Sequence, residues 1–231
     1  MRVRSFIIAY VLIVAILLFA DRRPNLAKPT HYSHVVDLTD GPASLTAASA
    51  KSAESKTRII APAALIPGTW TAGQIPQERL VAPLVVMDLS TLHLNTVDLN
   101  ASTGPQISLD DIASWESIHG MIPAGSLIAI RRSNPASVAR VDSSTDALPI
   151  ERDAAQFLIA ARSTIGFATE TPVDFTSDRE LARQLALHGN YVVESASGFK
   201  ALPETGSLII VAPAKNIKPG RAQVRILAMV H

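Results

Sequence analysis

The chain contains no cysteine in its 231 residues. Disulfide bonds, thiolate-ligated metals and cysteine nucleophiles are therefore excluded. An excess of charge of one sign is also lacking: the formal net charge is +1 and Lys and Arg form no cluster, so we expect no nucleic-acid partner. The chain has neither a Gly-rich phosphate loop nor a G-x-S-x-G motif, and the sequence therefore does not predict a serine hydrolase with a nucleophile elbow.

The N-terminus is the most apolar part of the chain. Arg2 and Arg4 precede an unbroken apolar run over residues 6–20, and Arg22 and Arg23 follow it. As a helix this run would reach only ~22 Å, against ~30 Å for the hydrocarbon core of a bilayer. Residues 1–21 are therefore predicted to be a signal peptide or an N-terminal membrane anchor, and residues 22–32 a linker. We expect an exported protein, periplasmic or extracellular, that contacts a membrane only through this segment.

Strand-like and helix-like stretches alternate through the rest of the chain. Ser108, with Asp111 three residues later, predicts a helix start, and Gly120 predicts its end. A β-branched run over residues 84–90 predicts a buried strand. Further helices are expected over residues 151–163 and 178–188, and further strands over residues 33–39, 126–132, 164–170, 191–195, 207–215 and 222–230. This mixture predicts an α+β fold.

Several segments resemble the putative cyclase family, which includes bacterial kynurenine formamidase and isatin hydrolase. Residues 57–67 (TRIIAPAALIP), followed by Gly68, Thr69, Trp70 and the strand APLVVMDLS, are similar to the family signature H-x-G-T-H-x-D-x-P-x-H and the strand after it. SLDDIASWESIHGMIPAGSLIAIRR and GFATETPVDF resemble later family segments in the same order. The resemblance implies a cyclase-like domain over residues 33–231, with a swivelling β/β/α architecture and mixed β-sheets. It also implies a homo-oligomer, either a dimer or a tetramer.

In this family the first two His and the Asp of the signature bind a divalent metal, usually zinc or manganese, and the last His acts in proton transfer. The alignment places Glu54, Arg58, Ile60 and Ala64 at the positions of the first His, the second His, the Asp and the last His, and it places Ala182 and Glu194 at a later His and Glu. Ile60, Ala64 and Ala182 have no donor atoms, and a guanidinium at position 58 repels a cation. Glu194 is then the only ligand position retained. We therefore expect no catalytic residue and no metal cofactor, and we predict that Arg58 and Glu194 form a buried ion pair across the vacated site.

Three functions remain open from the sequence. The first is an exported or membrane-anchored family member that resembles a metal-dependent arylformamidase but is catalytically inactive, a pseudoenzyme. The second is an active metal-dependent amidohydrolase acting on N-formylkynurenine-like or cyclic amides, which would need unrecognised ligands such as Glu54, Glu194 and a histidine. The third is a non-catalytic subunit or small-molecule-binding partner of an active paralogue.

Overall fold

The computed structural model describes residues 32–40, 56–92, 105–132, 147–215 and 218–231. Residues Tyr32–His231 form one compact unit. The predicted signal peptide or anchor and all but the last residue of the predicted linker lie outside the described residues. None of the helices within the described ranges has both the length and the apolarity needed to cross a membrane.

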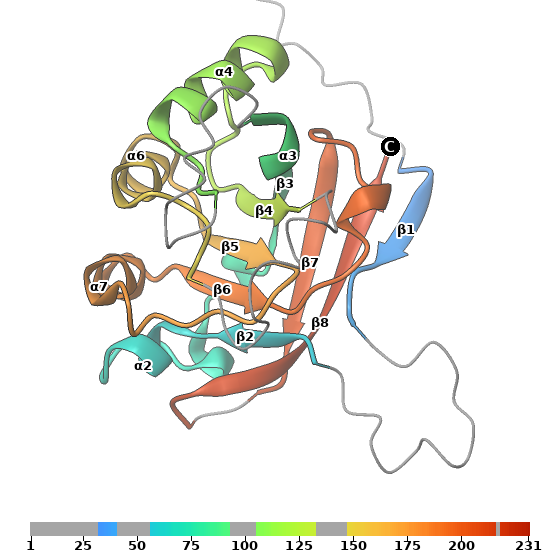
Figure 1. The fold of residues 1–231 in the computed structure, drawn as a ribbon. Helices are drawn as coiled ribbons and strands as arrows, with labels where there is room; N and C mark the ends of the chain where they lie inside the picture. The colour runs from blue at the N-terminus through green and yellow to red at the C-terminus, as the bar shows by residue number, and fades with distance from the viewer. Residues whose placement is uncertain (1–31, 41–55, 93–104, 133–146, 216–217) are drawn as a thin grey trace, which may run out of the picture. The chain divides into compact units, whose positions relative to one another are not determined.

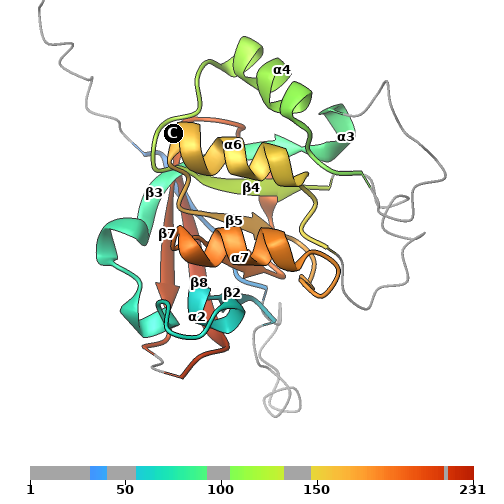
Figure 2. The same ribbon diagram turned by 90° about the vertical axis from the view of Figure 1, so that its left-hand side faces the viewer.

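Four neighbouring strands of the sheet are parallel, and each connection between them contains at least one helix (Figures 1 and 2). A crossover of this kind is required because parallel strands cannot be joined by a tight turn. The order along the chain is β3 (Val81–Asp88), α3 (Leu89–Leu92), α4 (Leu109–His119), β4 (Leu127–Arg131), α6 (Arg152–Arg162), β5 (Gly166–Thr169), α7 (Arg179–Leu187) and β6 (Tyr191–Glu194).

Antiparallel strands close this sheet on itself. The order is β1-β8-β2-β6-β5-β4-β3-β7, and an additional pairing of β7 with β8 joins the two sides. These strands are β1 (His34–Asp37), β2 (Arg58–Ile60), β7 (Ser207–Pro213) and β8 (Arg221–Val230). The short elements are the helix α2 (Pro62–Leu65) and the 3-10 helices η1 (Ala72–Gln74), η2 (Gln77–Arg79) and η3 (Phe199–Ala201). The predicted α+β class with mixed strand pairing is confirmed.

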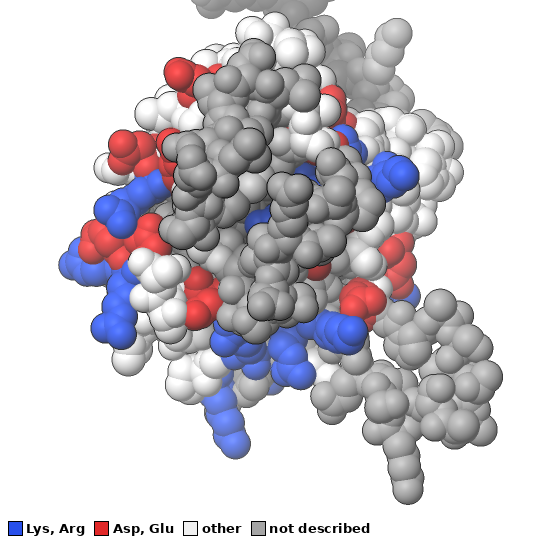
Figure 3. All heavy atoms as spheres, viewed as in Figure 1, with Lys and Arg blue, Asp and Glu red and all other residues white. Residues whose placement is uncertain are grey.

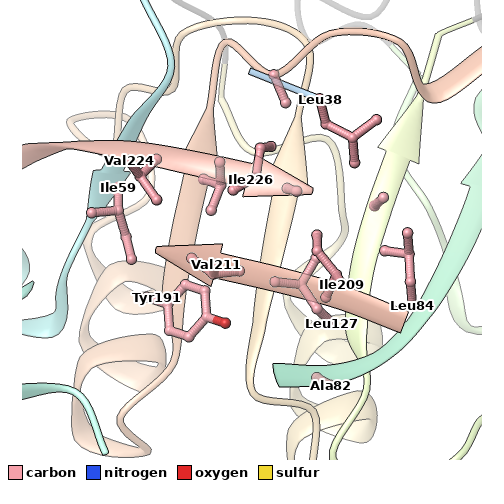
Figure 4. Close-up of a cluster of buried hydrophobic side chains, with 14 of the residues drawn as sticks. Leu38, Ile59, Ala82, Leu84, Leu127, Tyr191, Ile209, Val211, Val224 and Ile226 are labelled. Carbon is pink, nitrogen blue, oxygen red and sulfur yellow. The ribbon is translucent and has the colours of Figure 1, made fainter. Parts of the chain in front are cut away.

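Hydrophobic cores lie on both sides of the closed sheet. Figure 4 shows the inner core, in which side chains of β2, β3, β4, β6, β7 and β8 point toward one another. The outer core lies between the sheet and the helices α4, α6 and α7. Successive side chains of a strand alternate between faces, so Ile59 belongs to the inner core and Ile60 to the outer one. This alternation directs Ile60 toward α2 and α7, where the candidate site lies.

Local sequence signals account for the ends of α4. The Ser108 hydroxyl accepts a hydrogen bond from the Asp111 backbone N–H, and the Asp111 carboxylate accepts one from the Ser108 backbone N–H. Gly120 ends the helix with a φ of 85°, a conformation that glycine adopts without a steric penalty. The predicted boundaries of this helix are confirmed.

Candidate functional site

A hollow of about 600 Å³ lies between α2 and α7. Three positions that the family alignment assigns to metal-site residues line it, namely Ile60 at the end of β2, Ala64 on α2 and Ala182 on α7. The fold therefore brings these three positions, which are far apart in the sequence, to one place. Its complete lining is Ile60, Ala64, Leu65, Ile66, Asp174, Phe175, Thr176, Arg179, Ala182, Arg183 and Arg221.

Glu194 lies at the carboxyl end of β6, and its carboxylate is fully engaged next to this hollow. The side chain is only 5% exposed. Nε of Arg221 donates to Oε1 of Glu194 at 2.7 Å, and the backbone N–H of Val173 donates to Oε2 at 2.9 Å. Arg221 also donates from Nη2 to the Val173 carbonyl oxygen at 2.6 Å. One guanidinium thus fixes both the retained carboxylate and the loop that follows β5.

The predicted partner of Glu194 was wrong. The backbone of Arg58 does lie opposite Glu194 in the β2–β6 pairing, as predicted. Within the described part of the chain, however, the ion pair of Glu194 is with Arg221. Arg221 begins β8, lies opposite Ile60 and reaches diagonally past β2, which a long side chain can do on one face of a sheet. The pair itself is present, but its cation comes from another strand.

The residues present do not fit the divalent metal that the resemblance implies. Ile60, Ala64 and Ala182 bring no donor atom to the hollow, and the guanidinium of Arg221 already occupies the oxygen that faces it on Glu194. Within the ranges that the structure describes, no three His, Cys, Asp or Glu residues are grouped so that they could hold a metal ion. Glu54 lies outside the described residues.

A second polar cluster lies at the carboxyl ends of β3 and β4. Nε of Arg131 is 2.8 Å from Oδ2 of Asp88, and Nη2 of Arg131 is 3.5 Å from Oε1 of Glu204. His119 lies 3.1 Å from the other Glu204 oxygen. Arg131 also donates to two backbone carbonyls of the η3 region. These contacts tie the ends of two parallel strands to the segment before β7, which is a structural role.

Glu170 lies near this cluster and accepts a hydrogen bond from the backbone N–H of Arg132 at 3.1 Å. Burial raises the pKa of the Glu170 carboxyl, and the nearby Asp88 charge acts in the same direction. The hydrogen bond from Arg132 and the charge of Arg131 act in the opposite direction but do not cancel the effect of burial.

Sequence reasoning missed the arginines of the hollow, Arg179, Arg183 and Arg221. Arg179 and Arg183 are separated by one helical turn, which places them on the same face of α7. The helix predicted over residues 178–188 could therefore have grouped them. No sequence signal could have placed Arg221 there, because its position depends on the register of β8 against β2.

Comparison with known proteins gives the same picture of the scaffold. A family model described as putative cyclase matches residues 27–173, which is more than half of the chain. Isatin hydrolase A from Labrenzia aggregata, solved with benzyl benzoate, is 25% identical with a TM-score of 0.63, and the match covers 85% of this chain and 93% of that one. Isatin hydrolase A from Ralstonia solanacearum is 22% identical with a TM-score of 0.63, over 96% and 97% of the two chains.

A structure titled as a potential metal-dependent hydrolase with cyclase activity is 21% identical with a TM-score of 0.58, over 84% of this chain and 96% of that one. No curated protein matches the sequence.

Proposed function

Because the chain belongs to the putative cyclase family, we propose that it keeps the scaffold of a metal-dependent hydrolase and lacks the metal-dependent reaction. One observation carries this proposal. The ligand position that the chain retains, Glu194, is neutralised by a side chain of the protein itself, Arg221. Around that pair, the other aligned positions in the hollow hold Ile60, Ala64 and Ala182.

The electrostatics of the pair support the proposal. A metal ion that bound Glu194 would have to displace the guanidinium, and Arg221 would then lose its carboxylate partner. Displacement would also break the hydrogen bonds of Arg221 and Glu194 to Val173. Separating Glu194 from its partner is costly because this carboxylate is almost fully buried. The other carboxylate in the described part of the hollow, Asp174, already accepts hydrogen bonds from Thr176 on both oxygens.

Hydrolysis assays test the proposal. The full chain is incubated with isatin and with N-formylkynurenine, after dialysis and again with added zinc or manganese, and isatin hydrolase A from Ralstonia solanacearum serves as the positive control. We expect no rate above that of the buffer blank in any condition.

A metal-dependent rate that disappears in a Glu194→Ala variant would contradict the proposal. That variant separates activity of this chain from activity of a contaminant, because a contaminating enzyme would survive the substitution.

A further inference from the structure

The hollow between α2 and α7 carries an excess of positive side chains. Arg179, Arg183 and Arg221 line it. Arg221 is neutralised by Glu194. Arg183 is 3.9 Å from Glu180 in a pair whose side chains are both more than half exposed, and such pairs contribute little. Arg179 forms no ion pair with any described residue.

The hollow has one carboxylate in its lining, and that carboxylate is engaged locally. Both oxygens of Asp174 accept hydrogen bonds from Thr176, one from the backbone N–H and one from the hydroxyl. The hydrogen bonds from Thr176 hold the pKa of Asp174 below its ordinary value. Because Arg221 is already paired with Glu194, Arg179 and Arg183 remain to face the single carboxylate of the described lining, Asp174. This balance leaves the site suited to an anion and unsuited to a free cation.

Apart from Thr176, the remaining lining is apolar. Ile60, Leu65, Ile66, Phe175 and Ala182 supply hydrocarbon or aromatic surface to the same hollow. Its volume of about 600 Å³ lies within the range of small-molecule sites. Figure 3 shows Lys and Arg side chains at the lower edge of the view, where Figure 1 places β2 and the start of β8, and Lys or Arg mixed with Asp or Glu at the left, where Figure 1 places α7.

We propose that this hollow binds an organic anion, a carboxylate carried on an apolar body, with Arg179 and Arg183 as its ligands. A guanidinium presents a planar fork of donors that matches a carboxylate, and both arginines stand on one face of α7 with donors open to solvent. The apolar lining takes the body of the molecule. This inference rests on the proposed function, because a metal in the hollow would occupy the same space.

The experiment uses the full chain and isothermal titration with benzoate, with benzamide as the neutral analogue of the same shape and with inorganic phosphate as an anion without an apolar body. The variants are Arg179→Gln/Arg183→Gln, which removes the two charges, and Ala64→Phe, which fills the hollow without changing its charge. Arg225→Gln is the matched control, because Arg225 lies on the same strand as Arg221, pairs with Asp37 of β1 and is not among the residues that line the hollow.

We expect benzoate to bind at least tenfold more tightly than benzamide and more tightly than phosphate, with an affinity that falls as salt is added. The double variant should weaken benzoate binding at least tenfold, Ala64→Phe should weaken it as well, and Arg225→Gln should leave it unchanged.

Equal binding of benzoate and benzamide, unchanged binding by the double variant, or tighter binding of phosphate than of benzoate would each overturn the inference. Absence of benzoate binding together with absence of hydrolysis would reject this inference alone. Metal-dependent hydrolysis would reject the proposed function.

Discussion

Arg221 and Arg225 lie on the same strand and each pairs with one carboxylate, but the surroundings of the two pairs differ. Arg221 contacts Glu194, which is almost fully buried, whereas Arg225 is largely exposed and its partner Asp37 is half-exposed. The Coulomb energy of an exposed pair is screened by water, while a buried carboxylate that loses its partner keeps its desolvation cost. The contribution of each arginine to the stability of the fold therefore depends on its position on the strand and not on its residue type.

Replacement of Arg221 tests this difference. We expect Arg221→Met to lower the free energy of unfolding by about 2–3 kcal/mol, below the usual range for a buried pair because Arg221 itself is half-exposed. Arg225→Met should cost less than about 1 kcal/mol. Urea titration at pH 7 measures both values, and equal losses in the two variants would contradict the account. Adding Glu194→Leu to Arg221→Met should recover part of the loss.

At Glu170 we expect a substitution to raise the free energy of unfolding, in contrast to the substitutions of Arg221 and Arg225. Burial raises the pKa of its carboxyl, so the ionised form is disfavoured in the folded state. The contribution of Glu170 to stability is then present below its unfolded pKa of about 4.3 and is lost as the pH rises through the folded pKa. Glu170→Gln keeps an acceptor for the Arg132 backbone N–H and carries no charge. We expect it to be more stable than the parent at pH 7 in urea titrations, with the advantage disappearing near pH 4. A variant that is less stable at pH 7 would refute this reading.

Among the elements, α4 and α6 are joined by a bidentate ion pair on the outer side of the sheet. Nε and Nη2 of Arg162 donate to the two oxygens of Glu116 at 2.7 and 2.8 Å, and the backbone N–H of Ile122 donates to Oε1 as well. The pair connects the last turns of two helices with the loop before β4. Helix positions in this layer depend on such links as well as on the apolar contacts beneath them.

The α4–α6 pair predicts an acid-sensitive link. The hydrogen bonds from Arg162 hold the pKa of Glu116 below its ordinary value, against the opposing effect of burial. A lowered folded pKa gives a stabilisation that is present above the unfolded pKa of about 4.3 and is lost as the pH falls through the folded pKa. We expect Glu116→Gln to cost about 1–2 kcal/mol at pH 7 and much less at pH 3, as followed by urea unfolding across pH. A cost that stays constant down to pH 3 would show that the charge is not responsible.

At the scale of the whole folded unit, the closed sheet separates the scaffold from the site. None of the described residues of the inner core lines the hollow, which lies on the outer side between α2 and α7. Ile60 and Arg221 join the sheet through their backbones, so their side chains do not determine the strand pairing. Side chains in the hollow can therefore change without a change of fold. This separation explains how a chain can belong to the cyclase family while Ile60 and Ala182 stand at aligned ligand positions and Ala64 stands at the position of the last His of the signature.

The sequence predicted most of the elements and part of the site. The helix between Ser108 and Gly120 carried its own boundary signals. The β-branched run indicated a strand over residues 84–90, whereas β3 begins earlier, at Val81, and ends at Asp88, where α3 begins. Ile60, Ala64 and Ala182, which the family alignment had singled out, line one hollow. Arg221 escaped prediction because β8 pairs with β1, β2 and β7, and the register of such long-range pairs is fixed by packing of the whole sheet. The strand β2, three residues long, is too short for a period-two signal.

The metal content of the purified protein tests the central claim most directly. The full chain is expressed in medium supplemented with zinc and manganese, purified without chelators and measured by elemental mass spectrometry against its protein concentration, with isatin hydrolase A from Ralstonia solanacearum prepared in parallel. If Arg221 has taken the place of the cation at Glu194, zinc and manganese together should remain far below one ion per chain. About one tightly held ion per chain, lost in a Glu194→Ala variant, would contradict the account.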